Sequence, residues 1–249
     1  MPLALIIPAR NEAACIGHVL QRIPAGLAAQ IIVVDNDSQD ATAAVALQAG
    51  AEVHREPRRG YGQACLTGLA HLRDEMDVVG FLDADGSDDP RLLRDLVAPI
   101  LAGAADFVVS ARTLGLAREN LSPQQKFGNW LACVLIRALW GYRYTDLGPL
   151  RVIRRAALDR LQMRDRTWGW TVEMQIKAVT AGLRIRQVDI PYGHRIAGTS
   201  KISGSLLGTV RAGWKILATI ATLRLRERRP ARHHGPVPDV RESEDAARR

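Results

Sequence analysis

The segment FLDADGSDDP, residues 81–90, carries four aspartates in a chain whose formal net charge is +8. Asp83 and Asp85 follow an apolar run that is typical of a buried strand. Two carboxylates one residue apart at a strand end offer hard oxygen ligands to Mg²⁺ or Mn²⁺, which proteins usually hold with one or two carboxylates and the phosphates of a substrate. Such a metal neutralises a diphosphate leaving group. We therefore predict that Asp83 and Asp85 bind a metal, beside a Gly86 that lets a ligand approach the backbone.

The same aspartates also suit a solvated turn before a helix. In that interpretation Asp88 or Asp89 accepts hydrogen bonds from the first N–H groups of the helix. An Asp-x-Asp pair alone does not distinguish a metal site from a capped turn, so the surrounding elements have to decide.

Strands and helices alternate along the first half of the chain. Apolar runs predict strands at residues 3–7, 31–35, 51–56, 78–83 and 106–112, and helical patterns lie between them at 12–23, 41–50, 60–73 and 89–101. Pro8 is expected to end the first strand. This alternation is typical of βαβ units and a parallel sheet. Ligands of such sheets bind beyond the carboxyl ends of the strands, where the polar clusters at 10–12, 35–37 and 83–89 fall.

The second half has a different pattern. We expect a mobile loop at 113–125, an apolar helix at 126–141, a strand and turn at 145–155, a helix at 170–181 and a strand at 183–192. A long amphipathic helix follows. The predicted units are a catalytic domain at 1–202, the amphipathic helix at 203–229 and a disordered basic and polar tail at 230–249.

Composition limits the class of protein. The chain has 249 residues and is 47% hydrophobic, enough for one large domain with appendages. Its pI near 10.0 favours an anionic partner: nucleic acid, a membrane surface or a phosphorylated substrate. The three cysteines have no CxxC spacing, which indicates reduced thiols and a cytoplasmic setting. We find neither a secretory signal nor eighteen clean apolar residues for a membrane span.

Four motifs in order, IIPARNEAACIG, IIVVDNDSQDAT, GYGQACLTG and FLDADGSDDP, resemble the nucleotide-sugar domain of family 2 glycosyltransferases. The downstream motifs TDLGPLRVIRR, GWTVEMQIKAVTAGLRIRQVDIPY and RIAGTSKISG are similar to the branch of dolichol-phosphate mannose synthase and bacterial polyprenyl-phosphate glycosyltransferases. The resemblance covers about residues 3–205. It implies a GT-A fold: an α/β, Rossmann-like, mostly parallel sheet flanked by helices, here with a C-terminal amphipathic helix.

The resemblance also implies roles on the donor side. The base and ribose pocket would be lined by Pro8, Ala9, Arg10 and Glu12, and Asp35 would accept a hydrogen bond from the ring N–H of the base, in UDP or GDP. The remaining residues expected around the nucleotide-sugar are Asp37, Gly60, Gly62, Asp83, Ala84 and Asp85. Helix capping is the alternative for Glu12 and Asp35, and a plain helix entry is the alternative for the two glycines.

On the acceptor side the resemblance implies a phosphate. A phosphate monoester is largely anionic at neutral pH, so it needs cations more than a general base. We expect Arg112, Arg195, Ser200 and Lys201 to bind it, with Arg112 counted as catalytic beside Asp83 and Asp85; surface charge is the alternative. Arg151 is a weaker candidate, and Arg154 is interpreted as surface charge. Asp146 and Glu173 would orient the acceptor or support a loop without serving as bases.

Two departures from the family pattern concern the metal shell and the acceptor. Ser87 stands where the related synthases often have a glutamine, so water is expected to complete the metal shell. The loop at 113–126 lacks the usual Arg–Ser pattern, so a soluble acceptor stays an alternative to the lipid phosphate.

Residues 203–225 favour an interfacial helix. Apolar residues recur at helical spacing, and Arg211 and Lys215 interrupt them, so the helix is expected to lie on a membrane and not to cross it. The basic residues that follow would attract anionic lipids at about 1 kcal/mol each: Arg224, Arg226, Arg228, Arg229 and Arg232. The alternative is a stripe packed on the domain and a soluble tail.

The sequence thus predicts a metal-dependent inverting glycosyltransferase that moves a hexose from a UDP- or GDP-sugar to a polyprenyl phosphate at the cytosolic membrane face. No nucleic-acid partner is expected. The alternatives are a soluble acceptor, nucleotidyl transfer, or a non-catalytic binder of nucleotide-sugar or nucleic acid. Nucleotidyl transfer is disfavoured because no long Gly-rich loop bearing Lys or Arg follows the first strand.

Overall fold

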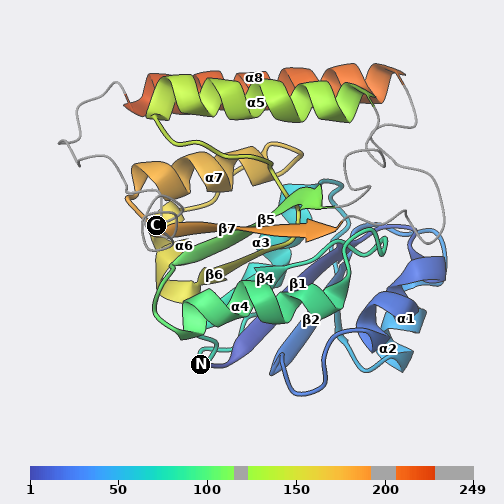
Figure 1. The fold of residues 1–249 in the computed structure, drawn as a ribbon. Coiled ribbons are helices and arrows are strands. Elements are labelled where there is room, and N and C mark those ends of the chain that lie inside the picture. Colours follow the sequence, from blue (N-terminus) through green and yellow to red (C-terminus); the bar gives the residue numbers. More distant parts are fainter. Residues whose placement is uncertain (115–122, 192–205, 228–249) are drawn as a thin grey trace.

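The computed structural model describes residues 1–114, 123–191 and 206–227, which form a seven-stranded sheet with helices on both faces (Figure 1). The strands are β1 (Leu3–Ala9), β2 (Gln30–Asp35), β3 (Glu52–Arg55), β4 (Val78–Phe81), β5 (Phe107–Leu114), β6 (Arg151–Arg154) and β7 (Ile185–Pro191). The helices are α1 (Ala13–Gln21), α2 (Thr42–Gln48), α3 (Tyr61–Ala70), α4 (Leu93–Leu101), α5 (Pro123–Trp140), α6 (Arg155–Leu161), α7 (Trp170–Thr180) and α8 (Leu206–Glu227), with a 3₁₀ turn at Pro90–Leu92. The predicted α/β, mostly parallel fold is confirmed.

The direction of the strands creates the functional edge. The spatial order is β3-β2-β1-β4-β6-β5-β7. Strand β6 pairs antiparallel with both β4 and β5, and every other pair is parallel. Because β4 and β5 are both antiparallel to β6, they run in the same direction. The carboxyl ends of β2, β1, β4 and β5 therefore reach one edge, in that order.

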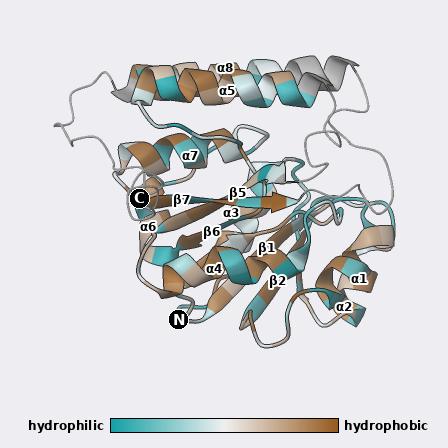
Figure 2. Cartoon of the chain, viewed as in Figure 1, coloured by the Kyte–Doolittle hydropathy of each residue, from teal (hydrophilic) through white to brown (hydrophobic). Residues whose placement is uncertain are grey.

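The apolar runs are continuous because successive side chains of a strand point to opposite faces of the sheet, and both faces are covered. In β1, Leu5 and Ile7 pack in the core that also holds buried residues of α1 and α4, whereas Ile6 packs in the core beneath α7. Strand β1 is hydrophobic along most of its length, whereas the edge strand β7 carries hydrophilic residues (Figure 2).

The first strand continues through Pro8, which corrects the prediction that proline ends it. Pro8 lies opposite Val34 in β2, while the pairing of β1 with β4 stops at Ile6. The carbonyl oxygen of Ile6 accepts from the N–H of Leu82, which follows β4. Two residues later, the ring nitrogen of Pro8 points to that same side, beyond the end of the ladder, so no hydrogen bond is lost.

Helices α5 and α8 lie side by side as an outer layer over α7 (Figure 1). Ile220 and Leu223 of α8 are buried in the core that α5 and α7 share. Near the ends of both helices, Arg224 lies over the Trp140 ring at 5.9 Å, so α5 and α8 run in the same direction. The described part of the predicted unit 203–229 thus packs on the domain.

Helix α6 is an element that the sequence patterns did not predict. It begins directly after β6, and its N-terminus has no side-chain cap to announce it. With seven residues it is also too short to show a clear helical period.

Candidate functional site

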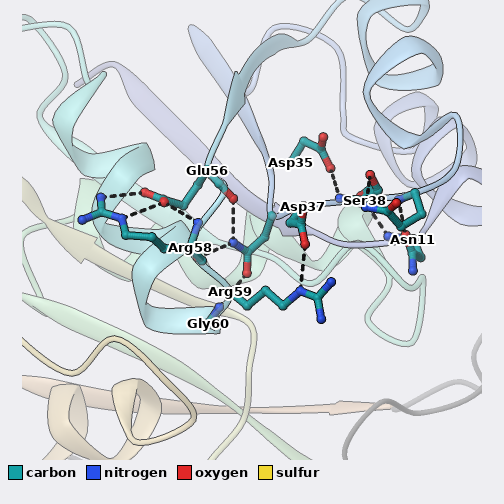
Figure 3. Close-up of polar contacts among 10 residues, drawn as sticks. Asn11, Asp35, Asp37, Ser38, Glu56, Arg58, Arg59 and Gly60 are labelled. Atoms are coloured by element: carbon teal, nitrogen blue, oxygen red, sulfur yellow. Dashed lines mark hydrogen bonds and ion pairs between the residues drawn. The ribbon is translucent and has the colours of Figure 1, made fainter.

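The fold brings most of the predicted chemical residues to one edge of the sheet. Arg10 and Asp83 follow β1 and β4, and Asp35 ends β2. Arg112 lies two residues before the end of β5, whose carboxyl end meets theirs at this edge. Figure 3 shows part of this edge, where the segments after β1, β2 and β3 are joined by hydrogen bonds. The predicted phosphate-binding residues Arg195, Ser200 and Lys201 lie outside the described residues, as do Arg228, Arg229 and Arg232.

Two turns at this edge have left-handed residues, Asn11 with φ 50° and Asp37 with φ 62°. The turns fasten each other: Asn11 N–H donates to Ser38 Oγ at 3.0 Å, and Asn11 Oδ1 accepts from Gln39 N–H at 2.7 Å. Non-glycine residues with this backbone are uncommon and are concentrated at ligand sites. The turns after β1 and β2 therefore hold each other in one arrangement, here called the wall, at the carboxyl-terminal edge of the sheet.

Glu12 and Asp35 are buried in this wall, 8% and 7% exposed. The Glu12 side chain makes no capping hydrogen bond to α1, and its N–H donates to Thr42 Oγ1 at 2.8 Å. Asp35 Oδ1 accepts from Ser38 N–H at 3.1 Å, which closes the turn after β2. Helix capping therefore explains neither carboxylate, and their predicted contact with a nucleotide stays a prediction.

Asn36, which the sequence analysis did not single out, holds the segment between β3 and α3. Its Nδ2 donates to the carbonyl oxygens of Glu56 and Arg58 at 3.0 and 2.8 Å, and its Oδ1 accepts from Gly60 N–H at 2.8 Å. The signal was available, because Asn36 directly follows Asp35 in the same motif.

Glu56 fixes this segment from within. Its carboxylate is buried and accepts side-chain hydrogen bonds from Arg58, Gln63 and Thr67. The hydrogen bond from Arg58, followed by those of Thr67 and Gln63, holds the pKa of Glu56 well below its usual value against the opposing effect of burial. A buried carboxylate with so many donors stabilises one conformation of the loop.

Asp37 pairs with Arg59 at the surface of the same region (Figure 3). Arg59 Nε donates to Asp37 Oδ2 at 2.7 Å, and this bond lowers the pKa of Asp37, with smaller contributions from the charges of Arg10 and Arg55. Three arginines therefore act on this one aspartate.

Gly60 and Gly62 pack against the chain itself. A Cβ at Gly60 would overlap the carbonyl oxygen of Arg166, and a Cβ at Gly62 would overlap that of Asp165. The N–H of Gly62 donates to the Thr167 carbonyl at 3.2 Å. Their lack of a side chain is thus used to seat the start of α3 on the segment 165–167, a use that the sequence did not reveal.

The aspartates after β4 have different tasks. Asp89 caps the 3₁₀ turn, since its Oδ1 accepts from Arg91 N–H at 3.1 Å, and it pairs with Arg22 at 2.9 Å. The capping interpretation is confirmed for Asp89. Asp88 is fully buried, and neither of its carboxylate oxygens has a hydrogen-bond partner among the described residues. Burial, and next the charge of Asp83, raises the pKa of Asp88 to about 8.

Asp83, Asp85 and Asp88 are here called the acidic cluster. Asp85 is 6% exposed, and its Oδ1 accepts from the N–H and the hydroxyl of Ser87 at 2.9 and 2.5 Å. Ser87, expected to be a poor metal ligand, thus orients the second aspartate of the pair.

The acidic cluster fits a hard divalent cation that shares its shell with a ligand. No group of three or more His, Cys, Asp or Glu within residues 1–114, 123–191 and 206–227 converges closely enough to hold a metal by itself. Mg²⁺ and Mn²⁺ prefer carboxylate oxygens and take further oxygens from phosphates and water. Because its pKa is about 8, the buried Asp88 carboxyl group is mostly protonated at neutral pH, and a cation bound nearby would favour its ionised form.

Arg112, near the carboxyl end of β5, is held by Asp146. Nε donates to Asp146 Oδ2 at 2.6 Å and Nη2 to Oδ1 at 2.9 Å, a forked pair whose side chains are 12% and 5% exposed. The Arg112 N–H donates to the same carboxylate at 2.9 Å. Asp146 therefore fixes the guanidinium in one orientation.

A cavity of about 500 Å³ opens beside this pair, between α5 and the segment 143–146. Lys126, Arg137 and Arg143 line it, and none of the three forms an ion pair with any residue that the structure describes. Trp130 and Val134 of α5 line it as well and are 57% and 42% exposed. The cavity is therefore both cationic and apolar.

Glu173 supports a loop, one of its two predicted roles. It accepts from the N–H of Arg164 and of Asp165, at 2.7 Å from the latter, and pairs with Lys177 at 2.7 Å. Glu173 thereby anchors the segment that meets Gly60 and Gly62.

The two other arginine candidates have structural partners. Arg151 is fully buried and donates to the Pro149 carbonyl and to Thr171 Oγ1. Arg154 ends β6, the reversed strand, so it lies at the opposite edge, where it donates to the Ile100 carbonyl.

Comparison with known proteins agrees with this geometry. An uncharacterised glycosyltransferase of Mycobacterium tuberculosis is 37% identical over 87% of this chain and 98% of its own length. The undecaprenyl-phosphate mannosyltransferase of Micrococcus luteus is 29% identical over 84% of this chain and 90% of its own length. Among solved structures, glucosyl-3-phosphoglycerate synthase of M. tuberculosis, in complex with Mn²⁺, UDP and glucosyl-3-phosphoglycerate, matches with a TM-score of 0.73 and 25% identity over 95% of this chain and 88% of that one.

The matching family model is described as glycosyl transferase family 2 and covers residues 4–162, more than half of the chain. Those residues include β1 to β6 and with them the acidic cluster, Arg112 and Asp146. The chain therefore belongs to glycosyl transferase family 2 and is a glycosyltransferase of the GT-A fold.

Proposed function

We propose that this protein transfers a hexose, with inversion, from a nucleoside-diphosphate sugar to a polyprenyl phosphate, and that it requires Mg²⁺ or Mn²⁺. The observation that carries the proposal is the position of the acidic cluster. In the strand order it lies between the fixed wall of the β1 and β2 turns and the forked Arg112–Asp146 pair. A donor nucleotide on one side and an acceptor phosphate on the other would meet at the carboxylates.

On the donor side, the wall would bind the nucleoside and the acidic cluster the diphosphate. Asp35, buried at the end of β2, would accept the ring N–H of the base. Asp83 and Asp85 would hold the metal, with Ser87 fixing the orientation of Asp85. The metal would supply neutralisation of the departing nucleoside diphosphate.

On the acceptor side, the phosphate would itself be the nucleophile. It is mostly a dianion at neutral pH, so Arg112 would bind and orient it and no side chain would need to remove a proton. Asp146 keeps the Arg112 fork rigid, which lowers the cost of holding the phosphate in line with the anomeric carbon.

The neighbouring cavity supports an amphiphilic acceptor. Its three cations suit a phosphate, and Trp130 and Val134 suit the hydrocarbon beside it. The M. luteus relative is also named for a polyprenyl phosphate, undecaprenyl phosphate. A soluble phosphorylated acid is the second candidate, because the structurally similar synthase was solved with glucosyl-3-phosphoglycerate.

The outer layer supports binding to a membrane surface. Phe127 and Trp130 of α5 are 61% and 57% exposed, and Trp214 of α8 is 73% exposed. Exposed aromatic residues beside lysine and arginine favour a lipid interface. The predicted apolar stripe of α8 is divided: Trp214 faces solvent, whereas Ile220 is buried. No helix in the described part of the chain is both long and apolar enough to cross a membrane.

A transfer assay tests the proposal. UDP- and GDP-hexoses with a labelled sugar are incubated with Mn²⁺ and either undecaprenyl phosphate in detergent or 3-phosphoglycerate. We expect label in the organic phase only with the lipid phosphate, and release of a nucleoside diphosphate and not of pyrophosphate. Label that stays in a water-soluble product made from phosphoglycerate would contradict the lipid acceptor.

Arg112→Lys supplies the matched variant, with Arg154→Lys as control. Lysine cannot form the forked pair, so we expect Arg112→Lys to lower transfer at least about tenfold. Arg154 lies at the opposite edge, and its replacement should leave the rate unchanged.

A further inference from the structure

Lys215 of α8 forms an ion pair that reaches inward from the outer layer. Its Nζ lies 2.9 Å from Asp165 Oδ2, and the Asp165 side chain is 8% exposed. The other oxygen of Asp165 accepts from the N–H and the hydroxyl of Thr167 at 2.7 and 3.0 Å. Burial alone would raise the pKa of Asp165, but the hydrogen bonds of Lys215 and Thr167 outweigh it and lower that pKa. Lys215 therefore balances a largely buried charge.

The segment that Asp165 starts is the support on which α3 begins. Gln63 N–H donates to the Arg166 carbonyl at 2.9 Å and Gly62 N–H to the Thr167 carbonyl at 3.2 Å. At Gly60 and Gly62 there is no room for even one added carbon between the two segments. A close-packed contact of this kind transmits a displacement of one side to the other.

The start of α3 is in turn fastened to the donor side. Gly60 N–H donates to Asn36 Oδ1 at 2.8 Å, and Asn36 directly follows Asp35 at the end of β2. Contacts thus run without a break from Lys215 through Asp165 and Gly60 to the turn that would bind the nucleoside.

Helix α8 approaches this segment closely at a second point. A Cβ at Gly169 would overlap both Asp165 Oδ2 and Thr219 Oγ1 of α8. Glu173 of α7 holds the segment by its backbone N–H groups, whereas Lys215 is the residue of α8 that binds its side chain.

We propose that Lys215 is a positioning residue for the donor site. By fixing Asp165 it keeps the segment 165–167 seated against Gly60 and Gly62, so the outer helix contributes to the affinity for the nucleotide. This inference rests on the proposed donor function and adds a residue far along the chain from the donor motifs.

Calorimetric titration of UDP and GDP in the presence of Mn²⁺ tests it on Lys215→Met, Lys215→Arg and Trp214→Ala. We expect about tenfold weaker nucleotide binding for Lys215→Met. Lys215→Arg, which keeps the ion pair, should restore the affinity. Trp214→Ala changes the neighbouring residue on the solvent side of α8 and should bind as the wild type does. In the transfer assay, Lys215→Met should raise the donor KM and leave the acceptor KM unchanged.

Two outcomes would overturn the inference. If Lys215→Met is folded, as judged by its thermal unfolding, and binds nucleotide as tightly as the wild type, Lys215 does not position the donor site. If Trp214→Ala weakens binding as much, the effect is general to α8. Should Lys215→Met not fold, Lys215→Gln takes its place with the same expectation. Failure of the wild type to bind either nucleotide would instead defeat the proposed donor site, and the role of Lys215 with it.

Discussion

At the scale of single residues, partners decide what each carboxylate does. Glu56 and Asp89 are surrounded by donors and stabilise loops, and Asp85 has Ser87 to orient it. Asp88 is buried with no hydrogen-bond partner in the described part of the chain. A buried carboxyl group without a hydrogen-bond partner lowers the stability of the fold unless a cation binds beside it. Functional sites often carry such a loss of stability.

Glu56→Gln tests the structural group. The folded-state pKa of Glu56 is lowered from 4.5, so its stabilisation is complete above about pH 5 and is lost as the pH falls, because the unfolded chain takes up the proton first. We expect the variant to be about 1–3 kcal/mol less stable at pH 7, the usual range for hydrogen bonds to a charged group. The difference from the wild type should shrink below about pH 4. Urea unfolding at several pH values measures it, and a difference that does not depend on pH would contradict this role.

At the scale of elements, the start of α3 shows how tightly the site is assembled. Gly62 meets the Asp165 carbonyl, whereas an added Cβ at Gly128, inside α5, would meet no atom of the other described segments within 4 Å. The two glycines therefore form a matched pair for one substitution.

We expect Gly62→Ala to lower the free energy of unfolding by about 1–3 kcal/mol, as overpacking does, and to weaken nucleotide binding. Gly128→Ala should leave stability unchanged or raise it by up to about 1 kcal/mol, because alanine is the better helix former. Thermal unfolding of both variants checks this. Equal effects of the two substitutions would mean that the contact with the segment 165–167 is not tight.

The sequence predicted the elements whose signals are local. Apolar runs marked the strands, and polar residues such as Asp35 and Asp83 marked their carboxyl ends. What it missed depends on contacts between distant segments: the continuation of β1 through Pro8 depends on where β4 stops pairing, and the packing of Gly60 depends on residues more than a hundred positions away. The different roles of Asp88 and Asp89 could not be predicted either, because these neighbours differ in burial and hydrogen bonding, which depend on the fold.

At the scale of the whole molecule, the sheet and the outer helices have different proposed roles. The sheet edge gathers the donor residues, and α5 and α8 form a face with exposed aromatic residues over α7 (Figure 1). The Lys215–Asp165 pair connects the two. The proposed transfer from a soluble donor to a membrane-held acceptor would use both parts.

Replacing Trp130 and Trp214 together by serine tests the outer face. We expect about tenfold weaker binding to vesicles that contain phosphatidylglycerol, because buried tryptophan contributes a large apolar area at an interface. Leu47→Ser, at a 59% exposed position of α2, is the control and should bind as the wild type does. Flotation with vesicles measures the bound fraction, and equal binding by all three proteins would place the membrane contact elsewhere.

The acidic cluster is the centre of this account, and calorimetric titration of UDP and GDP with and without Mn²⁺ tests it most directly. Asp85→Asn and Asp89→Asn each remove one charge from the same segment, but Asp89 caps a helical turn. We expect one nucleotide to bind the wild type and Asp89→Asn only with metal, and we expect Asp85→Asn to lose this binding. Nucleotide binding that depends neither on metal nor on Asp85 would contradict it.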